Sequence, residues 1–451
     1  MAPPVRPRHR GEPRRPVPDL VLAGRALVGG RLQPLEVGVD GDGRIVDVGR
    51  SLSGDRRHDV GERVLLPSAT DVHVHFREPG PSTDAETIAS GTVGAALGGV
   101  GLVGEMPNTD PPVRTVDLLE AKSALVRGRA AVDVLLYAVP SSGAALQNLA
   151  RRAGGFKLYL SPTTGIDTVP SGADLTDRLR ELADVDLPLV VHAEDPALFR
   201  TGPPPVDLSG WDAARPVGAE AAAVRSALGA PERLRLHIAH VTTPALAREV
   251  VRRGASCEVS AHHLLLSTAA ARGAEGKVNP PLRSEKERTA LWAAYRDGTI
   301  PILASDHAPH GRPSKALPFG LAPSGAPGVQ TTVPLLLAKV ASGELPLEVL
   351  VRTACDRPAR LLGQPVGRLS VGHRANLLVV DFRARRRIRG EQLRSPCGWS
   401  PFEGAEAVFP QEHWRDGERI VDGGEYVGRP NGSVVRPEYA PGEPRGRPSS
   451  A

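Results

Sequence analysis

The sequence has few of the residues that mark several classes of protein. Its three cysteines (Cys257, Cys355 and Cys397) are odd in number and form no CxxC pair, which argues against a disulfide framework and favours a reducing compartment. Aromatic residues make up only 4% of the 451 residues, so few side chains are available to stack on bases. No apolar run approaches the roughly 18 residues of a membrane span, and the Pro-rich beginning lacks the apolar core of a secretory signal. These absences predict a cytoplasmic protein that binds neither nucleic acid nor membrane.

The charge of the chain is nearly balanced. Lys and Arg number 56 against 51 Asp and Glu, and five arginines with one glutamate lie in the first eighteen residues. This Arg/Pro-rich tail (1–18) and the closing stretch (428–451), rich in Pro, Gly and Arg, hold too little apolar surface to offset the entropy of ordering. We therefore expect both to be disordered. The rest of the chain is long enough for a large core in two or three domains.

Strand-like segments occur near both ends of the chain. Residues 19–66 alternate apolar and polar side chains around DGDGR, a typical hairpin turn. A second strand-rich piece, GRLSVGHRANLLVVDF, follows at 367–382. Neither is large enough to be stable alone. We predict that segments 19–66 and 366–427 pair into one small β-sandwich domain.

Between these segments, apolar runs of strand length alternate with stretches of helical period. The eight runs are DVHVHF, VGLVGEMP, VDVLLYAV, GGFKLYL, LPLVVHAE, LRLHIAH, SCEVSA and IPILASDHAPH. Strands that are nearly all apolar and are followed by helices are typical of parallel βα units. We predict an α/β fold in which residues 67–365 form a (β/α)8 barrel of the TIM type.

Polar side chains follow the predicted strands at their carboxyl ends, where barrels of this kind build their active sites. They are His73, His75, Asn108, Lys157, His192, His240, Asp306 and His310. The H-x-H spacing of His73 and His75 puts two imidazoles on one side of a strand, and imidazole is a good zinc ligand. An isolated H-x-H pair can also simply share a strand face. Histidines at the ends of two further strands favour a metal site.

Lys157 and Asp306 extend this candidate metal site. Lys157 alternates with apolar neighbours, so it points either into the barrel or, at the strand end, to solvent; an inward lysine needs a partner, a lost charge or a modification. Carboxylation by CO2 would make it an anion that bridges two metals. Asp306 either caps the next helix or binds a metal and takes a proton from an activated water.

Three further residues are candidates for substrate binding. Arg77 lies two positions beyond His75 on the same side, and its guanidinium suits a carboxylate ligand beside a metal. Asn108 and Asn279 lie in Pro-rich loops, where ordinary turn chemistry is the alternative role.

Together these residues resemble the amidohydrolase superfamily and, within it, the dihydroorotase family. The resemblance covers about residues 20–382 and rests on ordered motifs. The motifs are DVHVHFREPG (71–80), MPNTDPP (106–112), GFKLYL (155–160), VHAED (191–195), HIAHV (237–241), KVNPPLR (277–283), SDHAPH (305–310), APSGAPGVQT (322–331) and GRLSVGHRANLLVVD (367–381). H-x-H alone is weak, but this series in this order is specific.

The resemblance implies a binuclear centre with two Zn²⁺ per chain. Its ligands would be His73, His75, carboxylated Lys157, His192, His240 and Asp306. Arg77, Asn108 and His310 would hold a substrate carboxylate, whereas Asn279 and the backbone at Ser324 and Gly325 would hold the ring. Asp306 would also carry the proton in catalysis.

The activity that the resemblance implies is the reversible cyclisation of N-carbamoyl-L-aspartate to (S)-dihydroorotate and water, a step of de novo pyrimidine (UMP) biosynthesis, by a hydroxide that bridges the two zinc ions. One alternative is another cyclic amidohydrolase, similar to hydantoinases or allantoinases, although Arg77 argues against it. A second is a non-catalytic scaffold for aspartate transcarbamoylase, although this chain keeps all six ligands. Homo-oligomerisation and association with that transcarbamoylase both stay open.

Overall fold

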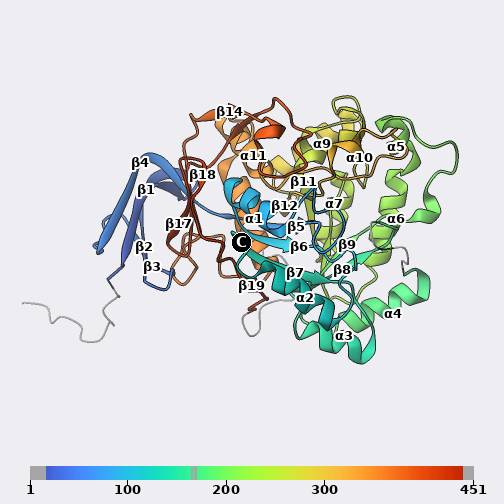
Figure 1. The fold of residues 1–451 in the computed structure, drawn as a ribbon, viewed down its shortest axis with the longest axis horizontal. Coiled ribbons are helices and arrows are strands. Elements are labelled where there is room, and N and C mark those ends of the chain that lie inside the picture. Colours follow the sequence, from blue (N-terminus) through green and yellow to red (C-terminus); the bar gives the residue numbers. More distant parts are fainter. Residues whose placement is uncertain (1–16, 164–165, 167–169, 440–451) are drawn as a thin grey trace, which may run out of the picture.

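A closed ring of eight parallel strands forms the centre of the computed structural model, which describes residues 17–163, 166 and 170–439 (Figure 1). The strands are β5 (Ala69–Val74), β6 (Val100–Glu105), β7 (Asp133–Ala138), β8 (Gly155–Tyr159), β9 (Pro188–His192), β10 (Arg235–Ile238), β11 (Ser256–Ser260) and β12 (Ile302–Ala304). The ring closes between its last and first strands, where the backbone N–H of His75 donates to the carbonyl of His307 at 2.7 Å. The predicted (β/α)8 barrel is therefore confirmed.

Helices follow the strands and pack around the ring. They are α1 (Ile88–Leu97), α2 (Val116–Val126), α3 (Gly143–Ala150), α4 (Gly172–Leu182), α5 (Leu208–Ala214), α6 (Val217–Ala227), α7 (Pro244–Arg252), α8 (Ala261–Leu265), α9 (Glu285–Arg296), α10 (Arg312–Lys315), α11 (Thr332–Ala341), α12 (Leu347–Val351) and α13 (Arg357–Leu361), with a π-helical turn (Arg352–Asp356) and short 3-10 turns at Pro196–Leu198, Gly273–Gly276 and Gly390–Gln392. Local sequence sets their starts. Ser284 and Glu287, for example, form a reciprocal capping box at the beginning of α9.

The two ends of the chain meet in one eight-stranded sheet beside the barrel (Figure 1). Its strands are β18 (Glu425–Tyr426), β17 (Glu418–Asp422), β16 (Glu412–Arg415), β13 (Leu377–Val380), β4 (Arg56–Pro67), β1 (Leu20–Val28), β2 (Arg31–Val39) and β3 (Ile45–Gly49), in this order. The antiparallel pair of β4 and β13 joins the two segments, with Leu66 opposite Leu378. The predicted pairing of the N- and C-terminal segments is confirmed.

Part of the segment 366–427 lies outside this sheet. Strands β14 (Arg385–Arg387) and β15 (Glu406–Val408) form a two-stranded sheet of their own, and β15 packs against α11 of the barrel. Val408 on β15 and Ile388, which directly follows β14, belong to the same buried apolar cluster as residues of the barrel.

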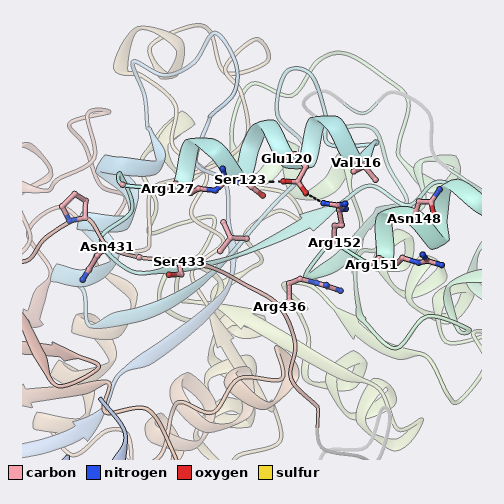
Figure 2. A pocket seen from close by; sticks show the side chains of 14 residues that line it. Val116, Glu120, Ser123, Arg127, Asn148, Arg151, Arg152, Asn431, Ser433 and Arg436 are labelled. Carbon is pink, nitrogen blue, oxygen red and sulfur yellow. Dashed lines mark hydrogen bonds and ion pairs between the residues drawn. The ribbon is translucent and has the colours of Figure 1, made fainter. Parts of the chain in front are cut away.

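Residues 428–439 differ from the expectation that the C-terminal stretch is disordered. They run along the barrel, where β19 (Val434–Val435) pairs in parallel with β7. Figure 2 shows that Ser433 and Arg436 of this segment line a pocket together with residues of α2 and with Arg151 and Arg152, which follow α3. Arg436 donates to the carbonyl of Ala150 at 3.2 Å, and Tyr439 donates to that of Leu361 at 2.6 Å. Composition alone missed this because tertiary hydrogen bonds, rather than an apolar pattern, hold the segment. The rest of that stretch (440–451) and residues 1–16 of the N-terminal tail lie outside the described residues.

None of the helices in the described ranges combines the length and the apolar character that crossing a bilayer requires.

Candidate active site

The predicted site residues gather at the carboxyl ends of the barrel strands. A cavity of about 60 Å³ lies there. Its lining consists of His73, His75, Arg77, Asn108, Lys157, Tyr159, Thr163, His192, His240, Asn279, Asp306, Ala308, Ser324 and Gly325. The predicted residue outside this lining is His310, whose Nε2 lies 3.1 Å from the Arg77 guanidinium. Parallel strands that end on one rim bring together residues up to about 250 positions apart in the chain.

The metal-ligand candidates face one another at short distances. Nε2 of His73 lies 3.2 Å from Nε2 of His75, 3.3 Å from Nζ of Lys157 and 3.4 Å from Oδ1 of Asp306. Nδ1 of His192 lies 3.0 Å from Nε2 of His240. His240 and Asp306 both have left-handed backbones, with φ of 37° and 48°, a strain that is typical of functional sites.

The outer nitrogens of three imidazoles are held by acceptors. Nδ1 of His73 donates to Glu258 at 2.5 Å, and Nδ1 of His75 donates to Oδ1 of Asn108 at 2.7 Å. Nε2 of His192 donates to Glu194 at 3.0 Å. Because each outer nitrogen carries the proton, the inner nitrogen of the neutral ring presents its lone pair to the cavity.

Burial keeps these rings neutral. It lowers the pKa of His73 to about 4, holds those of His75 and His240 well below the usual value, and lowers that of His192. Neutral imidazoles with inward lone pairs, beside a carboxylate, are a donor set that fits a divalent metal such as zinc. One atom each of His73, His75 and Asp306 lie within 4.8 Å of one another, close enough to share one ion.

Lys157 is fully buried on β8, so the alternative of a lysine that reaches solvent does not hold. Its burial lowers the pKa of the amine to about 8. Asp306 is also buried, and desolvation raises the pKa of its carboxyl. A carboxyl group that takes a proton more readily than an exposed one is suited to proton transfer.

Arg77 is fixed at the wall of the cavity. Its Nε donates to the carbonyl of Pro309 at 2.8 Å. Burial lowers the pKa of the guanidinium to about 10, so the group stays charged at neutral pH. Asn279 is also held, since its Oδ1 accepts from the indole N–H of Trp211 at 3.2 Å. Fixed polar groups of this kind orient a ligand without reorganisation.

Two carboxylates behind the histidines were not predicted from the sequence. Glu258 on β11 links His73 to His237, whose Nε2 donates to it at 2.9 Å, and Glu194 binds both His192 and Arg215. The signal for Glu258 was an acidic residue inside the apolar run SCEVSA. An acidic residue in an apolar run indicates a buried carboxylate, but it does not identify the residue with which that carboxylate pairs.

We expect Glu258→Gln to weaken zinc binding by about 10- to 100-fold, because the amide does not hold the tautomer of His73 as a carboxylate does. Competition between the protein and a chelator measures this affinity. The matched control is Glu412→Gln. Glu412 is a buried carboxylate on β16 of the eight-stranded sheet, outside the candidate site, and binds His58 at 2.9 Å. Equal zinc affinity of the two variants and the wild type would contradict the role of Glu258.

Residues 64–409 match the amidohydrolase family. The chain is 38% identical over 413 residues to the dihydroorotase of Halobacterium salinarum, which covers 89% of this chain and 96% of that protein. It is 34% identical over 421 residues to the dihydroorotase of Thermoplasma acidophilum, with 92% and 98% covered. Among solved structures, the L-hydantoinase (dihydropyrimidinase) of Arthrobacter aurescens superposes with a TM-score of 0.86 at 27% identity, over 93% of this chain and 99% of the other. The chain therefore belongs to the amidohydrolase family, and the resemblance drawn from its motifs is confirmed.

Proposed function

We propose that the protein is a dihydroorotase, which interconverts N-carbamoyl-L-aspartate and (S)-dihydroorotate in pyrimidine biosynthesis. The observation that carries the proposal is Arg77, a buried guanidinium held at the wall of the candidate metal site. It fits a cyclic amide that bears a carboxylate. Relatives that carry the name dihydroorotase, at 31–38% identity over most of both chains, support it. Free, buried cysteines support a cytoplasmic location.

The cavity offers separate groups for the two parts of the substrate. Arg77, Asn108 and His310 bind the carboxylate. The Oδ1 of Asn108 accepts from His75, so its NH2 group is the part that donates to the substrate. Asn279 and the backbone at Ser324 and Gly325, on the same lining, bind the ring.

Six side chains would hold two Zn²⁺ ions, namely His73, His75, Lys157, His192, His240 and Asp306. Bound metal supplies a hydroxide nucleophile at neutral pH and polarises the carbonyl under attack. Lys157 takes part as a carbamate, which gives it two oxygen donors. The lowered pKa of its amine supports this, because only the neutral amine reacts with CO2.

Asp306 moves the proton. When the ring opens, its carboxylate accepts the proton of the attacking water and delivers it to the ring nitrogen that leaves. When the ring closes, it takes a proton from the ureido nitrogen of N-carbamoyl-L-aspartate and returns it to the carboxylate oxygen that leaves as water. Its burial and its position beside His73 and His75 support this assignment.

A second candidate is a cyclic amidohydrolase for rings without a carboxylate, which the structural likeness to the L-hydantoinase favours. The two functions differ in what Arg77 does. A hydantoin or dihydrouracil ring has no anion to pair with this guanidinium, and an unpaired buried charge is costly.

Arg77→Ala separates these functions. We expect kcat/KM for dihydroorotate to fall about 10²-fold or more, because a charge-assisted pair is lost, while turnover of dihydrouracil is unchanged or rises. Ring opening is followed by the ultraviolet absorbance of the cyclic amide, with Arg225→Ala, an exposed arginine paired with Glu249, as control. Wild-type protein that opens dihydrouracil but not dihydroorotate would contradict the proposed function.

A further inference from the structure

Lysine is rare in this chain and mostly buried. Of the 56 Lys and Arg residues, six are lysines, at positions 122, 157, 277, 286, 315 and 339, which leaves 50 arginines. The side chains of Lys122, Lys157, Lys277 and Lys315 are buried. Lys157 belongs to the candidate metal centre, and Lys122 pairs with Glu105 at 2.7 Å. The proposed mechanism leaves Lys277 and Lys315 without a role.

Both of these lysines bind the same loop, residues 319–325. Nζ of Lys277 donates to the carbonyls of Phe319 and Ala322, both at 2.7 Å, and lies 3.4 Å from that of Gly320. Nζ of Lys315 donates to the carbonyls of Pro323 and Gly325, both at 3.0 Å. The loop is therefore held by two ammonium groups rather than by a helix or a strand.

The amino groups of Lys277 and Lys315 face carbonyl dipoles and aromatic rings, and burial lowers the pKa of both amines, that of Lys315 to about 7. Within the described part of the chain, neither ammonium forms an ion pair with a carboxylate within 4.0 Å. Instead, Nζ of Lys277 lies 4.5 Å from the ring centre of Trp211, and Nζ of Lys315 lies 5.4 Å from that of Trp399. Buried cations without a counter-ion are costly. Their carbonyl contacts therefore point to a function that depends on the position of this loop.

The loop forms one wall of the candidate active site through Ser324 and Gly325. The carbonyl of Ser324 accepts from Nε2 of His310 at 3.0 Å, and the backbone N–H of Gly325 donates to the carbonyl of Lys277 at 2.8 Å. With the five carbonyls bound by the lysines, six of the seven carbonyl oxygens of residues 319–325 thus accept a side-chain donor. Because these carbonyls are engaged, any change in the conformation of the loop would break several of these hydrogen bonds.

We propose that Lys277 and Lys315 are positioning residues that fix the loop 319–325, so that Ser324 and Gly325 meet the ring of the bound substrate. An ammonium group is compact and has three donors that can converge on several carbonyls, whereas the planar guanidinium that this chain uses elsewhere cannot. The identity of the substrate rests on the proposed function, but the hold on the loop does not.

The test replaces each lysine separately by methionine, whose unbranched side chain is one atom shorter and lacks the ammonium group. Hydrogen exchange reports on the loop directly through the amides of Leu321, Ala322 and Gly325, which are hydrogen-bonded in the structure. We expect their exchange to speed up about 10- to 100-fold in Lys277→Met and Lys315→Met. KM for dihydroorotate is expected to rise about 10- to 100-fold with kcat within about 2-fold, because the ring contacts act on ground state and transition state alike.

Two comparisons make the result specific. Lys339→Met removes a partly exposed lysine of α11 that pairs with Glu344 and should change neither readout. Lys277→Arg and Lys315→Arg keep the charge and should fall between the wild type and the methionine variants. Unchanged exchange of the three amides in variants with wild-type zinc content and melting temperature would overturn the proposal, and so would a fall in kcat at unchanged KM. If the wild type does not open dihydroorotate, faster loop exchange still supports the positioning role, and only the proposed function fails.

Discussion

Asp306→Asn is expected to lower kcat for the opening of dihydroorotate by about 10²- to 10⁴-fold, the usual contribution of a general acid or base. The amide keeps the shape of the side chain and one oxygen donor, but it can neither accept the proton of the attacking water nor return it to the ring nitrogen. The buried position of Asp306 beside His73 and His75 leaves little room for a substitute base from solvent. Steady-state kinetics at saturating zinc measure the effect.

Zinc content separates the two roles of Asp306. Metal analysis of the variant shows whether binding or proton transfer was lost, and Asp381→Asn, on a partly exposed residue paired with Arg383, serves as control. An Asp306→Asn protein that holds wild-type zinc and retains wild-type kcat would remove Asp306 from the mechanism.

Lys157→Ala is expected to reduce activity by more than about 10³-fold and to lower the zinc content per chain, because the two oxygen donors that we propose for carboxylated Lys157 would be lost. The cavity that the truncation leaves can admit a small carboxylic acid. Added acetate or propionate should therefore restore part of the activity. Native mass spectrometry of the wild type should show the added mass of one CO2, absent from the variant. Full activity of Lys157→Ala without added acid would contradict the bridging role.

The pKa of Lys157 gives this prediction a pH dependence. Burial lowers the pKa to about 8, so the amine is mostly charged below pH 8 and mostly neutral above it. Recovery of activity by metal-free protein, given zinc and the same concentration of dissolved CO2 at each pH, should therefore speed up as the pH rises toward about 8 and level off above it. A recovery rate that is independent of pH between 6 and 9 would show that the neutral amine is not what limits the reaction.

The barrel and most of its site could be predicted from the sequence because both depend on local patterns. Buried parallel strands are nearly continuous apolar runs, and the eight runs in the sequence are the eight strands of the ring. Once the strands are placed, their carboxyl ends lie on one rim. The proximity of His73, Lys157 and Asp306 can therefore be predicted without knowing any side-chain contact.

What could not be predicted depends on contacts between distant residues. Glu258 is 185 positions from His73, and no spacing rule connects the two. Lys277 lies in the motif KVNPPLR, yet its hydrogen bonds to the loop 319–325 are visible only in three dimensions. The segment 428–439 has the composition of a tail, but backbone pairing with β7 fixes it. Composition reports apolar burial well and hydrogen bonding by the backbone poorly.

The pairing of β4 with β13 has a consequence for how the protein is made on the ribosome. One edge of β4, ending at Pro67, pairs with β13. That strand (Leu377–Val380) is synthesised about 310 residues later. At about 5–20 residues per second this takes roughly 15 to 60 seconds of translation. During that interval the nascent chain carries an open, apolar strand edge, which is a site where chains associate wrongly. Synthesis, before β13 is available to pair with β4, is thus the stage at which we expect this fold to be most exposed to misassembly.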